Sequence, residues 1–481
     1  MTAPSPIAAR NPRTGVADYR FIPNTPADVA ALAADLRAAQ PAWQVAGLRH
    51  RITVLEGLRD AMARHADALR EAVETDTGRV FETAIELGVA GVWVDRWSRV
   101  ALETLEPQIT DTETPGLASK AGFSPYPVVG IISPWNFPLA LSLMDAIPAL
   151  LAGCAVMIKP SEVTPRFIDV MDRVLDDLPD LRPVLRYLRG AGDVGAAVVE
   201  HSDLVCFTGS TATGRKVAAQ AGARFIPCFT ELGGKDPAVI LPGADLARAA
   251  KALANGATLG SGQQCYSIER IYIPRADEPA FLKLLLAEVS KLHLSYPDPK
   301  TGDIGPLTFA PQAEVITRHL ADAVAKGAMV HCGGAIEHHG GGLWCPATVL
   351  SGVTHDMQIM TEETFGPILP VMAYDSVDQA VALANDSSYG LSAAVFGPED
   401  DAIAIAERLW AGGVSINDAG IAPMLMGDRL VAEKTAFRGS GLGGSRLGRD
   451  ALKRFVRKQA IIVNRNSGAS PWWYETLRAE D

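Results

Sequence analysis

Three polar side chains of this sequence lie in short motifs that could carry catalytic chemistry. Cys265 stands in GSGQQCYSIE, after a long alanine-rich helical stretch, and its thiol is either a nucleophile or one more inert buried cysteine. Glu231 ends an apolar run in TELGGKDP, where a carboxylate serves as a general base or lies solvated in a loop. Asn136 lies in the rigid motif PWNFP. Its side-chain amide either donates to an oxyanion or closes a local turn. Each motif alone leaves both interpretations open.

Two glycine-containing motifs are candidates for binding a phosphate group. In VCFTGSTATGRKVA, residues 205–218, an apolar strand ends in Thr208-Gly209-Ser210 and a helix begins at once, which suits an anion or a simple capped turn. GAGDVG, residues 190–195, matches the dinucleotide pattern GxGxxG. The preceding VLRYLR is a poor parallel strand, and no acidic residue follows at the expected distance. We therefore interpret GAGDVG as a plain turn before a helix.

The glycine-rich segment HCGGAIEHHGGGLWC contains four potential metal ligands. These ligands are Cys332, His338, His339 and Cys345. Their spacing does not fit the usual zinc patterns, and glycines dominate between them. We predict a flexible loop here and no metal site.

Composition limits the class of protein. The chain has 481 residues, 48% of them apolar, which is enough for two or three domains with large cores. The formal net charge of −11 and the absence of a dense Lys/Arg run argue against a nucleic-acid partner. Six cysteines without a CxxC pair favour reduced thiols. The N-terminus has no apolar core before a cleavage site, so we expect a cytoplasmic protein that binds a small molecule.

One apolar stretch, residues 139–158, has the length of a membrane span. Asp145, Pro148 and Gly153 interrupt it. We predict a buried helix, a glycine break and a core strand instead, and no contact with a membrane.

The chemistry-bearing motifs must be positioned by alternating strands and helices. Residues 27–75 show the spacing of amphipathic helices. From residue 126 onward, short apolar runs alternate with helical segments, which predicts βαβ units and a parallel sheet. The pattern resumes after Cys265, with helices near 277–292 and 400–411, and predicts a second α/β domain. The polar residues 106–126 predict a linker, an edge hairpin or both, and Ala460–Val463 predicts a further strand.

The order of the motifs resembles the NAD(P)-dependent aldehyde dehydrogenase superfamily over nearly the whole chain. The matching motifs are PWNFP, KPSEVTP, FTGSTATG, TELGGKDP, GQQC, EETFGP, SSYGLSAAVF and GGVSIN. The resemblance implies an α/β fold with two parallel-sheet domains, a Rossmann-like cofactor domain and a catalytic domain, plus a small β oligomerisation element. It places the cofactor domain at 1–106 and 126–232, the catalytic domain at 233–455, the oligomerisation element at 107–125 and 456–467, and a tail at 468–481. A homodimer or homotetramer is expected, in which the tail with Trp472, Trp473 and Tyr474 docks on the chain itself or on a neighbouring subunit.

The resemblance also implies a mechanism. Cys265 attacks an aldehyde carbon as a thiolate, and the Asn136 amide and the Cys265 backbone N–H hold the oxyanion. Hydride transfer to NAD then leaves a thioester, which water activated by Glu231 hydrolyses to the free acid. The residues assigned to the cofactor are Trp135, Lys159, Glu162, Gly209, Ser210, Glu363 and Phe365. Glu162 favours NAD over NADP, because a carboxylate at the ribose repels a 2′-phosphate.

The substrate is predicted from the pocket residues that the resemblance suggests, which are Leu141, Met144, Gln264, Tyr266 and Leu442. None is cationic, so we predict an apolar or aromatic aldehyde rather than an aliphatic aldehyde or a semialdehyde. A cysteine acyltransferase or hydrolase is a remoter alternative, because no histidine occurs in the matched motifs. A non-catalytic relative is also remoter, because Cys265, Glu231 and Asn136 are all present. Two departures stand out: Gly260 replaces a common asparagine, and residues 418–440 form an insertion that we expect to border the substrate mouth.

Overall fold

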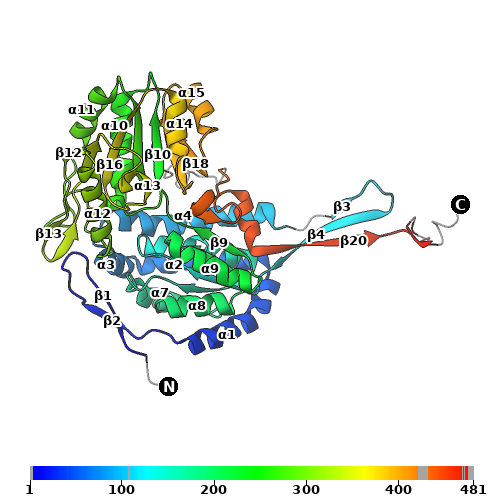
Figure 1. Ribbon diagram of the computed structural model, residues 1–481. Helices are drawn as coiled ribbons and strands as arrows, with labels where there is room; N and C mark the ends of the chain where they lie inside the picture. The colour runs from blue at the N-terminus through cyan, green and yellow to red at the C-terminus, as the bar shows by residue number, and fades with distance from the viewer. Residues whose placement is uncertain (1–3, 107–108, 421–431, 468–469, 471, 475–481) are drawn as a thin grey trace.

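Two largely parallel β-sheets form the two halves of the chain, and an antiparallel ribbon projects from them (Figure 1). The computed structural model describes residues 4–106, 109–420, 432–467, 470 and 472–474. The α/β class with two parallel-sheet domains is the one predicted from the sequence.

The first sheet is parallel except at one edge, and it carries most of the sequence motifs. Its strands in spatial order are β19 (Gly441–Leu442), β9 (Cys228–Glu231), β8 (Leu204–Thr208), β5 (Val128–Ile132), β6 (Ala155–Lys159) and β7 (Leu185–Tyr187). All residues of β5, β6 and β8 are buried, as expected for a parallel sheet that helices cover on both faces. Only β19 runs antiparallel to its neighbour.

Helices of the first half pack on this sheet and share one core with it. They are α1 (Pro26–Val45), α2 (Gly47–Arg64), α3 (Ala66–Thr77), α4 (Phe81–Thr104), α5 (Pro138–Met144), α6 (Ala146–Ala152), α7 (Phe167–Asp176), α8 (Gly192–His201) and α9 (Thr211–Ala223). At 139–158 the predicted glycine break and core strand are confirmed, while the single predicted helix is divided into α5 and α6. α6 ends at Gly153, whose φ is +100°, and β6 follows. In the described part of the chain, no helix has the length and apolarity needed to cross a bilayer.

The second sheet has seven strands and forms the other half of the molecule. In spatial order they are β12 (Met329–Cys332), β15 (Thr348–Ser351), β16 (Ile368–Tyr374), β11 (Ile268–Pro274), β10 (Asp236–Ile240), β17 (Ser392–Phe396) and β18 (Gly413–Ile416). Its helices are α10 (Leu246–Thr258), α11 (Glu278–Val289), α12 (Gln312–Ala325), α13 (Gln358–Thr361), α14 (Val377–Asn385) and α15 (Glu399–Ala406). The helices predicted near 277–292 and 400–411 are confirmed as α11 and α15.

A three-stranded antiparallel ribbon extends away from both sheets (Figure 1). It consists of β3 (Ile109–Asp111), β4 (Leu117–Pro125) and β20 (Val456–Asn464), and β20 pairs with β4 along its whole length. The hairpin predicted at 106–126 and the strand predicted at Ala460–Val463 are therefore confirmed. Ile462 on β20 is 62% exposed. An assembly role for this ribbon remains a prediction.

Sequence reasoning was wrong about three local features. The segment preceding GAGDVG contains β7, which pairs in parallel with β6, because three residues suffice for an edge strand. Within HCGGAIEHHGGGLWC, β13 (Glu337–His339) and β14 (Gly342–Trp344) form a hairpin rather than a loop, since Gly340 and Gly341 supply the positive φ of its turn. Residues 441–455, predicted within the catalytic domain, join the first half instead: β19 pairs with β9, and the 3-10 segment Arg449–Phe455 packs into the first core.

The N-terminal strands β1 (Ile7–Ala9) and β2 (Tyr19–Phe21) lie apart from the ribbon of β3, β4 and β20 (Figure 1). Near the N-terminus, β1 pairs with β2, and the loop between them contacts the second half, where Arg13 Nη2 donates to Ser295 O at 2.6 Å. At the other end, the aromatic side chains of Trp472, Trp473 and Tyr474 are exposed. Most of the remaining tail, 468–481, lies outside the described residues, so its docking stays a prediction.

Candidate active site

The carboxyl ends of four neighbouring parallel strands bring the predicted motifs to one edge of the first sheet. PWNFP follows β5, Lys159 ends β6, Gly209 and Ser210 follow β8, and Glu231 ends β9. These positions are adjacent because the strand order is β9-β8-β5-β6 and all four strands run in the same direction. In open α/β sheets, this edge is where ligands bind.

The Asn136 side chain is tied to the loop that carries the thiol. Asn136 is buried, and its Nδ2 donates to the Gln263 backbone oxygen at 3.0 Å. Its own backbone oxygen accepts a hydrogen bond from Arg79, which also donates to Gly260 O at 3.2 Å. The amide therefore lies beside the chain just before Cys265.

Arg79 is a site residue that the sequence did not reveal. Its guanidinium is buried and joins the Asn136 loop to the Gly260 loop, 57 and 181 residues away in the chain. A Cβ on Gly260 would lie 3.0 Å from Arg79 Nη1, and the φ of Gly260 is +63°. Glycine at position 260 therefore suits this loop, because the loop packs tightly on Arg79 and Gly260 has a positive φ. No motif marks Arg79, because it stands alone between Gly78 and an amphipathic helix.

Cys265 follows a loop in which three successive residues have positive φ. These residues, Gly260, Ser261 and Gly262, turn the chain sharply after α10. A Cβ on Gly262 would overlap the backbone of Gly366, so only glycine fits there. The thiol of Cys265 is half-buried, and burial raises its pKa to about 12. The neighbouring Glu231 carboxylate raises this pKa further, whereas Lys434 lowers it.

Glu231 lies where β9 ends and the chain turns past the thiol. Its side chain is buried, and a Cβ on the nearby Gly234 would lie 3.0 Å from the Cys265 backbone oxygen. The two glycines after Leu232 therefore allow the chain to pass close to Cys265. Glu231 Oε2 lies 3.6 Å from Lys434 Nζ, and neither atom makes a hydrogen bond within the described residues.

Lys434 is a cation near the thiol that the five predicted pocket residues, none of them cationic, did not include. It comes from the 418–440 insertion, yet its side chain is buried, and its Nζ lies 4.9 Å from the centre of the Tyr266 ring. A single lysine in AEKTAF carries no sequence signal for such a position. Residues 421–431 of the insertion lie outside the described residues, so its place at the border of the substrate mouth stays a prediction.

Glu363 and Phe365 come to the same place from the second half of the chain. Glu363 Oε1 accepts a hydrogen bond from Gly234 N at 3.0 Å, and burial together with the Glu269 charge raises the Glu363 pKa to about 8. The backbone N–H groups of Thr364 and Phe365 both donate to the Glu269 carboxylate at 2.8 Å. The Phe365 ring packs edge-on against Trp135 with ring centres 5.5 Å apart. Glu269, which no motif indicated, fixes this segment.

The remaining predicted cofactor residues line the edge of the first sheet. Lys159 Nζ lies 3.0 Å from Glu162 Oε2, and Ser210 caps α9 by accepting from Thr213 N at 3.3 Å. Gly209 N donates to Glu231 O at 3.1 Å. At this edge the buried hydroxyl of Ser133 makes no hydrogen bond within the described residues. A helix N-terminus, a cation–carboxylate pair and a buried unsatisfied hydroxyl fit the phosphates and ribose hydroxyls of a dinucleotide.

The five predicted substrate residues differ in exposure. Met144 is buried on α5, Leu141 on the same helix is half-buried, and Gln264 and Tyr266 flank the thiol. Leu442, on β19, is 55% exposed, and its backbone N donates to Thr230 Oγ1 at 2.8 Å.

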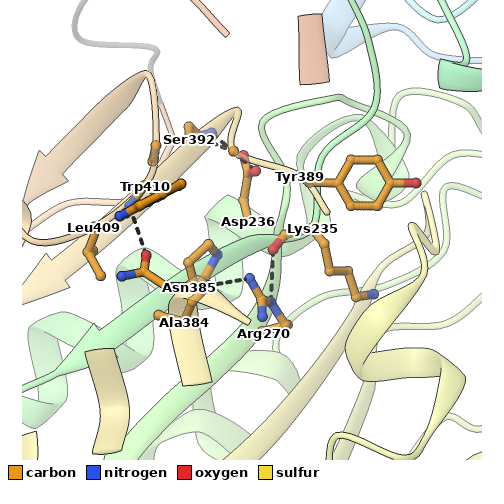
Figure 2. A pocket seen from close by; sticks show the side chains of 12 residues that line it. Lys235, Asp236, Arg270, Ala384, Asn385, Tyr389, Ser392, Leu409 and Trp410 are labelled. Atoms are coloured by element: carbon orange, nitrogen blue, oxygen red, sulfur yellow. Dashed lines mark hydrogen bonds between the residues drawn. The ribbon is translucent and has the colours of Figure 1, made fainter. Parts of the chain in front are cut away.

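A small cavity lies behind the site in the second half (Figure 2). Figure 2 shows Ser392 directed at the Asp236 carboxylate and the Arg270 guanidinium directed at the Lys235 backbone, where Arg270 Nε donates to Lys235 O at 2.8 Å. Burial raises the Asp236 pKa to about 7. Arg270 and Ser392 thus hold the backbone of Lys235 and the carboxylate of Asp236, in the segment that leads from Glu231. Among the described residues, no cluster of His, Cys, Asp or Glu has the arrangement of a metal site.

The arrangement of a thiol, a carboxylate and an amide at this edge agrees with the comparison with known proteins. Residues 2–461 match the aldehyde dehydrogenase family model. The chain belongs to the aldehyde dehydrogenase family. The resemblance predicted from motif order is therefore confirmed, and this aldehyde dehydrogenase is an oxidoreductase that acts on aldehydes.

Three relatives show how far this aldehyde dehydrogenase resembles known proteins. A Mycolicibacterium smegmatis protein, provisionally named an NADP(+) succinate-semialdehyde dehydrogenase, is 38% identical over 93% of this chain and 86% of its own length. A structure from Anabaena variabilis, provisionally named aldehyde dehydrogenase PutA, is 49% identical with a TM-score of 0.95, covering 98% of this chain and all of that one. Betaine aldehyde dehydrogenase from Staphylococcus aureus, solved in complex with NAD+, is 27% identical with a TM-score of 0.89, covering 98% and 94%.

Proposed function

We propose that this aldehyde dehydrogenase oxidises an aldehyde to the free carboxylic acid with NAD, through a thioester on Cys265. The supporting observation is the convergence of three motifs: the Glu231 segment passes Cys265 at Gly234, and Asn136 holds the chain at Gln263. These segments lie far apart in sequence. Covalent catalysis requires a nucleophile, a base and an oxyanion donor to be held together at one place.

The reaction proceeds by covalent catalysis. The Cys265 sulfur attacks the carbonyl carbon, a C–S bond forms, and the Asn136 amide and the Cys265 N–H donate to the oxyanion. Trp135, Glu363 and Phe365 would hold a nicotinamide, which when bound would supply the acceptor for the hydride that leaves this carbon as the thioester forms. Glu231 then takes a proton from the attacking water, the C–S bond breaks, and the acid departs as the thiolate re-forms.

A Glu231→Gln variant tests the hydrolytic step. The thiol and the amide remain, so one equivalent of NADH should form in a burst, while steady-state turnover falls by about 10²–10⁴, the typical contribution of a general base. Rapid mixing with absorbance at the NADH band measures both phases, and Cys265→Ala should abolish both. Unchanged steady-state turnover in Glu231→Gln would exclude the role. NADH formation by Cys265→Ala would exclude the thioester route, and with it a cysteine hydrolase or acyltransferase.

The proposed preference for NAD rests on Glu162. Its carboxylate is partly exposed beside Lys159, and it would accept a hydrogen bond from a ribose hydroxyl but repel a 2′-phosphate. One relative is named as an NADP(+) enzyme, so the cofactor preference of this chain has to be measured. We expect a higher kcat/KM with NAD than with NADP, and a smaller ratio in Glu162→Gln. A higher kcat/KM for NADP in the unmodified enzyme contradicts the assignment.

For the substrate we propose an apolar or aromatic aldehyde, on the basis of Leu141, Met144 and Tyr266, which the family resemblance suggests for the pocket. A second candidate is a semialdehyde, which two observations favour: the buried ammonium of Lys434, and the relative named for succinate semialdehyde. Measuring kcat/KM for benzaldehyde, a long-chain aldehyde and succinate semialdehyde separates the candidates. A clear preference for the last replaces the apolar proposal.

We further propose a cytoplasmic homo-oligomer that uses the ribbon of β3, β4 and β20. Ile109, Ile461 and Ile462 of this ribbon expose 40–62% of their surface, and exposed apolar side chains on strands favour pairing with a second copy. Light scattering should give a multiple of 51.0 kDa. A monomeric mass would contradict the proposal.

A further inference from the structure

Lys434 has a fixed position beside the catalytic residues. Its backbone N donates to Ser445 Oγ at 3.1 Å, and its backbone O accepts from Arg446 N at 2.9 Å. The apolar stem runs past Gly413, where an added Cβ would lie 3.4 Å from Lys434 Cδ. The side chain is 2% exposed. The ammonium is therefore held in the site by a closely packed stem and a well-bonded backbone.

The groups around this ammonium are predominantly anionic. Glu231 at the end of β9 lies 3.6 Å from Nζ. The charges of Glu231, of Asp236 on β10 and of Glu363 after α13 all act on the Cys265 thiol and raise its pKa. These carboxylates make a further negative charge at the sulfur costly in a buried site. An opposing cation is needed if the thiolate is to form.

Other cations near the site are already engaged. Arg446 Nη2 donates to Asp145 Oδ2 at 2.7 Å and to Thr208 Oγ1 at 2.8 Å. Lys235 Nζ lies 2.6 Å from Glu269 Oε2. Lys434, in contrast, lies over the face of the Tyr266 ring, next in sequence to the thiol residue, and its charge acts on Cys265. The charge of Lys434 therefore opposes the carboxylates that raise the Cys265 pKa.

We propose that Lys434 is the counter-ion of the Cys265 thiolate, so that the 418–440 insertion supplies a residue of the catalytic centre. The S–H proton leaves to solvent, the sulfur keeps the electron pair, and the ammonium, shared with Glu231, offsets the new charge. When the sulfur attacks the aldehyde, the negative charge moves to the oxyanion, which Asn136 holds, and Lys434 returns to Glu231 alone. The proposal rests on the proposed function of Cys265 and adds a residue to it.

The test measures thiolate formation without turnover. Cys265 alkylation by iodoacetamide, followed by peptide mass spectrometry from pH 6 to 10, is compared in the unmodified enzyme, Lys434→Met and Lys434→Arg. We expect alkylation at pH 8 to slow about tenfold or more in Lys434→Met, which corresponds to at least about one pKa unit, and to recover largely in Lys434→Arg. Lys291→Met, at an exposed lysine of the second half, should leave the rate unchanged.

Two results would overturn the proposal. One is an unchanged pH profile of Cys265 alkylation in folded Lys434→Met. The other is a loss confined to the KM of succinate semialdehyde, with alkylation unaffected, which would make Lys434 an anchor for the substrate carboxylate. Lys434→Met can fail to fold because it leaves Glu231 buried without a counter-charge. In that case Glu231→Gln is compared with the double variant Glu231→Gln/Lys434→Met, because both lack the Glu231 carboxylate. The proposal requires Cys265 to be alkylated more slowly in the double variant.

Failure of this proposal is distinguishable from failure of the proposed function. Cys265→Ala tests whether the thiol carries the oxidation at all. If Cys265→Ala is inactive and the Lys434 variants alkylate normally, the thioester route stands and the counter-ion does not. If Cys265→Ala retains activity, the proposed function falls, whatever the alkylation rates.

Discussion

Replacing Asn136 by alanine should damage catalysis far more than folding. The amide makes one hydrogen bond in the resting protein, from Nδ2 to Gln263 O at 3.0 Å, and both residues are buried. Loss of that donor should lower the free energy of unfolding by about 1–3 kcal/mol, the cost of an unsatisfied buried group. Loss of an oxyanion donor should lower kcat by about 10²–10³, or 2.7–4 kcal/mol of barrier, because the interaction strengthens only in the transition state.

A matched control separates these two effects. Ser261→Ala removes a buried hydrogen bond from the same loop, in which Ser261 Oγ donates to Gly305 O at 3.1 Å, but it removes no group facing the substrate. It should lose similar stability and keep kcat within a few-fold. Stopped-flow measurement of the NADH burst and thermal unfolding provide the two readouts. The reasoning is refuted if Asn136→Ala keeps the burst rate of the unmodified enzyme, or if Ser261→Ala loses as much.

Three further outcomes follow from the geometry. Gly262→Ala should lower Tm and activity together, because its Cβ would lie 2.5 Å from Pro367 N and the φ of +68° disfavours any side chain; differential scanning fluorimetry measures the first effect. Because burial raises the Cys265 pKa to about 12 and the thiolate is the reactive form, its alkylation rate should rise by about tenfold per pH unit between pH 7 and 9. Asp145→Ala should lower the free energy of unfolding by about 3–5 kcal/mol, since it leaves two buried arginines unpaired. Burial would raise the Asp145 pKa, but those arginines lower it overall, so its stabilisation is present above the unfolded pKa and is lost as the pH falls below it; urea unfolding at pH 7 and pH 3 checks the sign.

The first sheet could be predicted from the sequence because its strands are locally encoded. β5, β6 and β8 are short apolar runs buried on both faces, and each ends directly at a polar motif. The parallel direction then places those motifs at one edge without knowledge of any side-chain contact. β7 was not predicted, because a three-residue edge strand has too few apolar positions to give a recognisable pattern.

The supports of the site could not be predicted because they act across the chain. Arg79 is bonded to backbone oxygens 57 and 181 residues away, and Glu269 binds backbone N–H groups 95 and 96 residues away. Backbone partners leave no trace in side-chain spacing. The misplaced boundary at 441–455 has the same cause, because a two-residue strand, β19, joins the first sheet by pairing with β9.

Lys434 illustrates why the electrostatics of a site are harder to predict than its nucleophile. Motif order indicated Cys265 and Glu231, and both are groups whose charged forms are costly when buried. Such charges require a compensating cation, but any lysine or arginine in the fold can supply it, from any segment that reaches the site. Here the backbone of Lys434 is held by Ser445 and Arg446, residues in the segment that folds back onto the first sheet. The segment 441–455, which pairs with the first sheet, therefore also fixes Lys434 beside the thiol. In this way the 418–440 insertion places a residue in the site.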